Sequence, residues 1–113
     1  MNVEIKKISK IINEMVTFAM LGDAEKVNVS IENNKDMYKL LVIANNVKCS
    51  EKSVNNMRKL LNAPRQKAAE EYYWELTGDT DSPNDMALVG MMTDKANVIY
   101  EDSDLLIELH RYK

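Results

Sequence analysis

The sequence predicts a single α+β domain over residues 1–113, a two-layer sandwich with helices on one face of a four-stranded mixed sheet. The spacing of apolar residues changes along the chain from helical to alternating, back to helical, and again to alternating. This gives the element order α-β-β-α-α-α-β-β, and strands grouped apart from helices are typical of α+β folds. The length fits one domain, and no internal repeat or Pro/Gly/Ser-rich linker divides the chain.

The first element is expected to be an amphipathic helix over Val3–Leu21. Apolar residues recur there at steps of three and four positions, with polar residues between them. These apolar residues are Ile5, Ile8, Ile12, Met15, Val16 and Ala19. Gly22 follows directly and is the expected end of the helix.

Two strands are expected to follow as a hairpin. Residues Lys26–Glu32 alternate strictly between apolar and polar, which predicts a strand with one buried face. Asn33–Asp36 has the composition of a turn. Tyr38–Ala44 is apolar on both faces, so we expect an interior strand that packs beneath the first helix and the Met86–Met92 helix.

The second half of the chain predicts three helices and a closing hairpin. The helices are expected over Ser50–Leu61, with the serine as N-cap, over Gln66–Leu76 and over Met86–Met92. The strands are expected over Asn97–Glu101 and Leu105–His110, joined by a short polar turn.

Composition argues against several classes of function. A net charge of −3 does not favour nucleic-acid binding. The longest apolar run, Leu40–Ala44, is far shorter than the ~20 residues that span a bilayer, and no apolar segment suits a signal peptide. Cys49 is the sole cysteine, which rules out an internal disulfide and fits a cytoplasmic location. Without zinc spacing or a Walker loop, we expect no metal and no cofactor.

Two segments carry a family resemblance. Ile11–Met20, which contains Glu14, resembles the helix called the N box, and Met86–Met92 with the following Thr93–Val98 resembles the helix after a second glycine box and its strand. With the element order, they make the chain similar to the GHKL superfamily over nearly its whole length. That superfamily includes histidine-kinase catalytic domains, bacterial anti-sigma kinases, gyrase and mismatch-repair ATPases, and the resemblance implies a GHKL ATPase-like fold.

Most nucleotide-binding residues of that superfamily are missing from this sequence. Glu14 matches the glutamate that orients a water or hydroxyl, but Phe18 stands where an asparagine would hold magnesium. The turn Ala44–Val47 has neither the carboxylate that would bind adenine nor a glycine. No Gly-x-Gly pair lets backbone amides approach a phosphate. We therefore assign no catalytic residue and no metal ligand, and we favour a role that is not enzymatic.

Two functions remain open on these residues. The first is a non-catalytic regulatory or protein-interaction domain on a degenerate histidine-kinase-type ATPase fold. The alternative is a small-ligand or nucleotide-binding protein, or a weak kinase, that reuses an ancestral pocket lined by Glu14, Thr17, Asn45 and Asn46. Glu14 could equally be a plain solvent-facing residue at its helical spacing.

Tyr72, Tyr73 and Trp74 form the candidate interaction surface. Consecutive helical residues point about 100° apart, so the three aromatic side chains cannot all enter one small core. We expect them to contact a protein partner or a second copy of the chain, from a fixed helical element over Ser50–Leu76. The preceding pair Glu70–Glu71 is expected on a solvated face.

Overall fold

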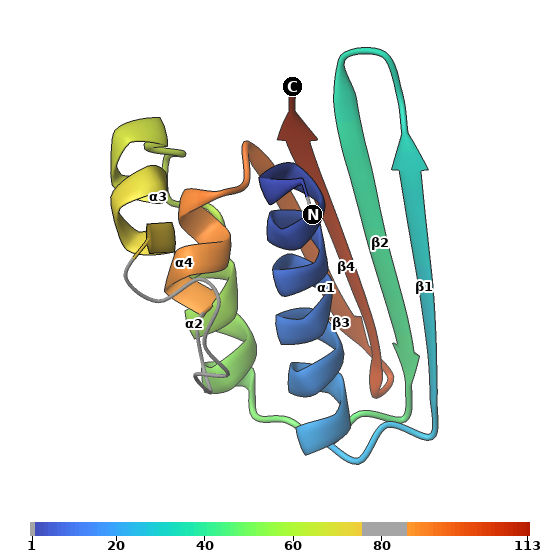
Figure 1. Cartoon of the computed structure of the whole chain (residues 1–113). Coiled ribbons are helices and arrows are strands. Elements are labelled where there is room, and N and C mark those ends of the chain that lie inside the picture. The colour runs from blue at the N-terminus through green and yellow to red at the C-terminus, as the bar shows by residue number, and fades with distance from the viewer. Residues whose placement is uncertain (1, 76–85) are drawn as a thin grey trace.

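The structure places a layer of helices on one face of a four-stranded sheet (Figure 1). The computed structural model describes residues 2–75 and 86–113. Within these residues the elements are α1 (Val3–Leu21), β1 (Lys26–Asn33), β2 (Met37–Asn45), α2 (Glu51–Leu61), α3 (Lys67–Tyr73), α4 (Met86–Met91), β3 (Lys95–Glu101) and β4 (Asp104–Tyr112). The predicted α+β class and element order are confirmed. Leu76, the expected end of the third helix, lies outside the described residues.

The sheet has the strand order β1-β2-β4-β3, and all three strand pairs are antiparallel. The expected mixed sheet is therefore wrong. A short turn closes each hairpin and forces antiparallel pairing within it, and the hairpins join through β2 and β4, which also run in opposite directions. Val42 shows the arrangement, because it pairs with Val29 of β1 on one side and with Ile107 of β4 on the other.

β2 is an interior strand, as predicted. Its residues Leu40, Val42 and Ala44 are buried on the side of the helices, and α1 packs directly on this strand. Leu41 and Ile43 point to the opposite, open face of the sheet and are half-buried there. The two-sided apolarity of β2 follows from its central place between two strands, and the described helices cover one face.

α1 has the predicted bounds and is the longest of the described helices. The side chain of Asn2 caps its start by accepting the N–H of Glu4 at 2.7 Å. Its other end closes at Gly22, whose carbonyl oxygen accepts the N–H of Lys48 at 2.7 Å. Neither α1 nor any other helix in residues 2–75 and 86–113 has the length and apolar character needed to cross a membrane.

α4 packs in the helix layer against α1, α2 and α3. A Cβ added to its Gly90 would lie 2.0 Å from the carbonyl oxygen of Leu60, so the glycine permits close contact between α4 and α2. α2 itself begins at the predicted N-cap Ser50, whose Oγ accepts the N–H of Ser53 at 3.0 Å.

Candidate functional site

Glu14 and Thr17 of α1 line a groove of about 360 Å³. The groove lies between α1 and α2, and the start of α4 closes one side of it. Its other lining residues are Phe18, Leu21, Ser53, Asn56, Met57, Leu60 and Met86. Two of the four residues predicted for the ancestral pocket therefore share one groove.

Glu14 is a buried residue, with only 5% of its surface exposed. The interpretation of Glu14 as solvent-facing is therefore wrong. The Lys10 ammonium lies 3.3 Å from its carboxylate, one helical turn earlier, and offsets its charge in this buried position. Phe18, one turn later, brings an aromatic ring to the same groove, and a ring offers no oxygen ligand to a hard cation.

Asn45 and Asn46 lie apart from that groove, at the end of β2. Asn45 continues the alternation of β2 on the open face of the sheet, and it lines a different cavity of about 300 Å³ there. Its Nδ2 donates to the Asp104 carboxylate at 3.3 Å, and the backbone N–H of Asn46 donates to the same oxygen at 3.2 Å. Asn46 has a φ of 54° and donates its side-chain amide to Glu25 at 2.9 Å.

The four predicted pocket residues are therefore not assembled into one site. The physical reason is the pleat of β2, which turns Asn45 away from the helix layer that carries Glu14. The two asparagines fasten the junction of the hairpins through Asp104 and Glu25. The prediction that these four residues share one pocket is therefore wrong.

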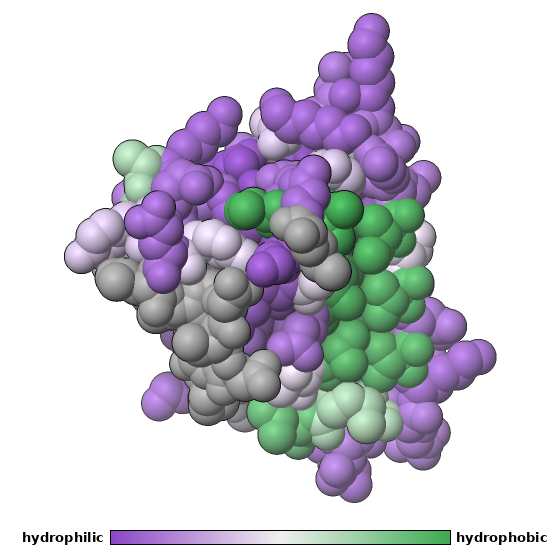
Figure 2. All heavy atoms as spheres, viewed as in Figure 1, coloured by the Kyte–Doolittle hydropathy of each residue, from purple (hydrophilic) through white to green (hydrophobic). Residues whose placement is uncertain are grey.

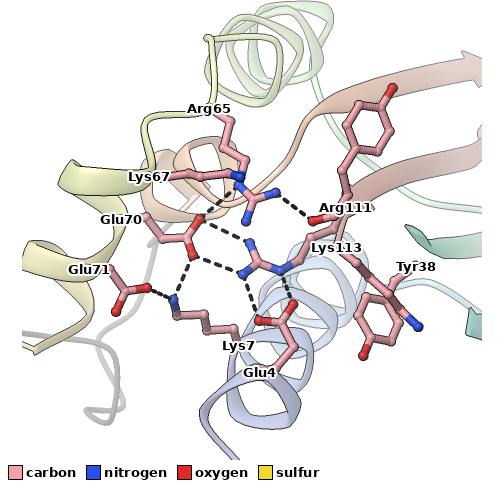
Figure 3. A pocket seen from close by; sticks show the side chains of 10 residues that line it. Glu4, Lys7, Tyr38, Arg65, Lys67, Glu70, Glu71, Arg111 and Lys113 are labelled. Carbon is pink, nitrogen blue, oxygen red and sulfur yellow. Dashed lines mark hydrogen bonds and ion pairs between the residues drawn. The ribbon is translucent and has the colours of Figure 1, made fainter. Parts of the chain in front are cut away.

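A third cavity, of about 520 Å³, contains a cluster of charged side chains that no motif indicated (Figure 3). At its centre the Glu70 carboxylate of α3 meets three cations. Its Oε1 accepts from Arg65 Nε at 3.1 Å and from Arg111 Nη1 at 3.1 Å, while its Oε2 accepts from Lys7 Nζ at 2.7 Å and from Arg111 Nη2 at 3.0 Å. The network therefore ties α3 to both α1 and β4.

Arg111 extends the cluster on the β4 side. Its guanidinium also donates to both oxygens of Glu4, at 2.7 and 3.0 Å, and to the backbone carbonyl of Met92 at 2.6 Å. Lys7 in turn donates to Glu71 of α3 as well as to Glu70. The charges in this cluster are thus satisfied by one another, as buried ion pairs require.

The pKa values follow from these contacts. Burial acts to raise the pKa of Glu70, but the hydrogen bonds from Arg111 and Lys7 outweigh it and hold the pKa at about 2. The hydrogen bonds from Arg111 likewise lower the pKa of Glu4. Burial acts to lower the pKa of Lys7, and its hydrogen bonds to Glu70 and Glu71 raise it overall. Both oxygens of Glu70 are occupied and the group stays ionised, so it is suited to bracing the fold and not to accepting a proton from a substrate.

The expected solvated face at Glu70–Glu71 is therefore wrong for Glu70, which is buried. One signal in the sequence could have found the cluster. Arg111 continues the alternation of Leu105, Ile107 and Leu109 on β4, so a strand that extends two residues further would place a buried arginine in need of anionic partners.

The three aromatic residues of the candidate interaction surface do not share one environment. Tyr72 is 62% exposed, as a contact surface requires. Trp74 is only 9% exposed and lies with its ring 6.0 Å from Lys7 Nζ, so its predicted exposure is wrong. The side chain of Tyr73 lies outside the described part of the structure.

β1 forms an edge of the sheet, with β2 as its neighbour in the described residues. The register sets Val29 opposite the buried Val42, so Val27, Val29 and Ile31 all face the side of the helices. Val29 and Ile31 are nevertheless 43% and 51% exposed, because the helix layer does not reach fully over this edge.

A matching apolar row lies on the flank of α1. Ile5, Ile12 and Val16 are seven and four positions apart, which places them along one side of the helix. The opposite flank carries Lys7 and Glu14 and faces α3 and α2. Figure 2 shows apolar residues gathered between α1 and β1. We call this surface the α1–β1 strip and define it as Ile5, Ile12, Val16, Val27, Val29 and Ile31.

Among the described residues, no group of three or more His, Cys, Asp or Glu side chains is arranged to hold a metal ion. Comparisons of the chain with protein families, with curated proteins and with solved structures found no match. Three features of the described residues bear on function: the groove between α1 and α2, the charged cluster around Glu70, and the α1–β1 strip.

Proposed function

We propose that this chain is a non-catalytic regulatory or protein-interaction domain on a degenerate GHKL ATPase-like fold. The observation that carries the proposal is the separation of Glu14 and Thr17, which line the groove between α1 and α2, from Asn45, which lines a different cavity on the open face of the sheet. Asn46 lines neither cavity and is bonded to Asp104 and Glu25. A ligand that needs all four residues finds no common site, because the sheet lies between the two cavities. The element order α-β-β-α-α-α-β-β supports the ancestry, since it is the order that the resemblance implies.

The chemistry of the groove supports the same proposal. Phosphoryl transfer depends on metal-neutralised phosphate charge, and the groove offers an aromatic ring at Phe18 where a metal ligand would be needed. Glu14 is the acidic side chain that lines the groove, and it already forms an ion pair with the Lys10 ammonium. The Glu70 carboxylate is a poor candidate for a catalytic base, because both of its oxygens already accept hydrogen bonds from cations and its pKa is lowered to about 2.

The surface supports a role in protein association. The α1–β1 strip exposes branched apolar side chains next to an open strand edge, and such patches commonly mark interaction sites. We propose that the partner is a protein, not a nucleic acid, in line with the net charge of −3. We also propose a cytoplasmic location, since Cys49 is the sole cysteine in the sequence.

Thermal unfolding with and without ATP·Mg²⁺ or ADP tests the proposal against the nucleotide-binding alternative. A ligand at about 100 times its dissociation constant would add roughly 2.7 kcal/mol to the free energy of unfolding, which is easily detected. We expect no shift in melting temperature with either nucleotide. A shift that Glu14→Ala removes would overturn the proposal in favour of the reused pocket. Asn45→Ala serves as the matched control on the other cavity.

A further inference from the structure

We propose that β1 pairs with β1 of a second copy of this chain, antiparallel and about a two-fold axis at Val29, so that two sheets become one. The inference rests on the proposed function, because it names the partner of the α1–β1 strip. An edge strand presents a row of backbone groups that another strand can extend, and main-chain hydrogen bonds then supply much of the affinity.

The pairing of β1 with β2 fixes which backbone groups of β1 face the open edge. The N–H of Asn34 donates to the carbonyl oxygen of Met37 at 2.9 Å, so these residues form the hydrogen-bonded pair nearest the turn. Bonded and non-bonded pairs alternate along an antiparallel ladder, and the even-numbered residues of β1 therefore bond to β2. Val27, Val29 and Ile31 turn their N–H and C=O groups outward, ready for a second strand.

The sequence of β1 is complementary to itself in the antiparallel direction. With Val29 opposite Val29 of the other copy, Val27 lies opposite Ile31 in both halves of the pair. All of these side chains face the side of the helices, so the two α1–β1 strips meet and cover each other. On the open face, Asn28 lies opposite Ser30, and polar side chains meet there.

At each end of the paired strands, a positive side chain of one copy lies opposite a negative side chain of the other. In the same register Lys26 of each copy lies opposite Glu32 of the other. Both side chains are exposed, and both lie on the open face of the sheet. Within one chain the Glu32 carboxylate lies 3.8 Å from Lys39 Nζ with more than half of its side chain exposed, so it remains accessible to a second cation.

Other registers lose this complementarity. A shift of two residues in one direction sets Glu25 opposite Ile31, and a shift in the other sets Val27 opposite Asn33. A shift of one residue moves the apolar row to the open face and breaks the hydrogen-bond alternation. β1 also lacks the proline or central charge with which edge strands usually avoid pairing. The strand therefore fits a second copy of itself in one register.

Sedimentation velocity over a wide range of protein concentration tests the register by charge reversal. The wild-type chain should form a concentration-dependent dimer. Lys26→Glu and Glu32→Lys should each weaken it by about tenfold, because each substitution sets like charges against each other at both ends. An equimolar mixture of the two variants should form a heterodimer of wild-type affinity, and the double variant should recover the homodimer. Failure of both rescues would overturn this register.

Proline substitution tests the edge itself. Val29→Pro removes an N–H that faces the open edge, so it should leave a folded monomer that no longer dimerises at any concentration used. Ser30→Pro is the matched control, because it removes an N–H that bonds to β2 and should lower the melting temperature of the monomer. Ile31→Lys provides a second variant that should be folded and monomeric. A dimer that persists in Val29→Pro or Ile31→Lys overturns the proposal.

The outcomes separate this inference from the proposed function. A wild-type chain that stays monomeric at every concentration and shows no nucleotide shift overturns the dimer alone. A dimer that responds to these variants but also binds ATP·Mg²⁺ through Glu14 supports the pairing and overturns the non-catalytic proposal.

Discussion

Both carboxylate oxygens of Glu70 accept hydrogen bonds from the guanidinium of Arg111, at 3.1 and 3.0 Å. The two residues lie 41 positions apart in sequence, and their side chains are each about 3% exposed or less. The contact joins α3 to the last strand of the sheet, and the shared contacts with Lys7 and Glu4 bring in α1. These contacts therefore connect three elements, α1, α3 and β4, at this end of the molecule.

Glu70→Gln should destabilise the fold by about 3–5 kcal/mol, since it leaves buried cations without their shared anion. Urea unfolding followed by circular dichroism measures the change. Glu71→Gln is the matched control, because the Glu71 side chain also contacts Lys7 but is 62% exposed, and its loss should cost less than about 1 kcal/mol. Equal effects of the two substitutions would show that the buried contact with Arg111 adds no stability.

The same pair predicts a dependence of stability on pH. The folded-state pKa of Glu70 is lowered from 4.5 to about 2, so its contribution is present above pH 4.5 and is lost as the pH falls toward 2. The loss should be on the order of 2–3 kcal/mol across that window. The free energy of unfolding, measured at several pH values, should fall more steeply for the wild type than for Glu70→Gln. If the wild type and Glu70→Gln lost stability equally as the pH fell, the pH dependence could not be assigned to Glu70.

The helices and strands could be predicted from sequence because local periodicity determines them. α1 has its predicted bounds, and Ser50 caps α2 as expected. The prediction of a mixed sheet was wrong because the pairing of β2 with β4 is a long-range property that no local pattern encodes.

Val42→Asp should unfold the domain. Val42 is fully buried in β2 between β1 and β4, and an unpaired carboxylate there costs several kcal/mol against a total stability of about 5–15 kcal/mol. Ile99→Asp makes the same chemical change on the open face of β3, where Ile99 is exposed, and should cost only about 1 kcal/mol. Cooperative thermal unfolding of Val42→Asp near the wild-type temperature would refute the placement of this strand.

Gly90→Ala should destabilise the domain, although the same change in an open helix usually gains about 0.5–1 kcal/mol. The new Cβ would meet the carbonyl oxygen of Leu60 at 2.0 Å, so α4 must move away from α2, at a cost of about 1–3 kcal/mol. Ala87→Gly on the exposed side of α4 is the control and should cost about 0.5–1 kcal/mol. A gain in melting temperature for Gly90→Ala would contradict the close helix contact.

The candidate site could be predicted only in part. Glu14 and Thr17 share a groove, because they lie one turn apart on one helix. Asn45 was assigned to the same pocket by family resemblance, whereas the strand pleat turns it to the other face. The cluster around Glu70 forms only where α1, α3 and β4 come together in the folded chain. The spacing of residues in the sequence does not show which distant elements will be in contact.

Residue-resolved hydrogen exchange of the β1 backbone amides tests most directly the claim that this chain associates through its open edge. At low protein concentration the amides of Val27, Val29 and Ile31 should exchange fast, while those of Asn28 and Ser30 stay protected by β2. At high concentration the outward amides should become protected as well, with little change elsewhere in the sheet. Outward amides that exchange equally fast at every concentration, while those of Asn28 and Ser30 remain protected, would contradict the account.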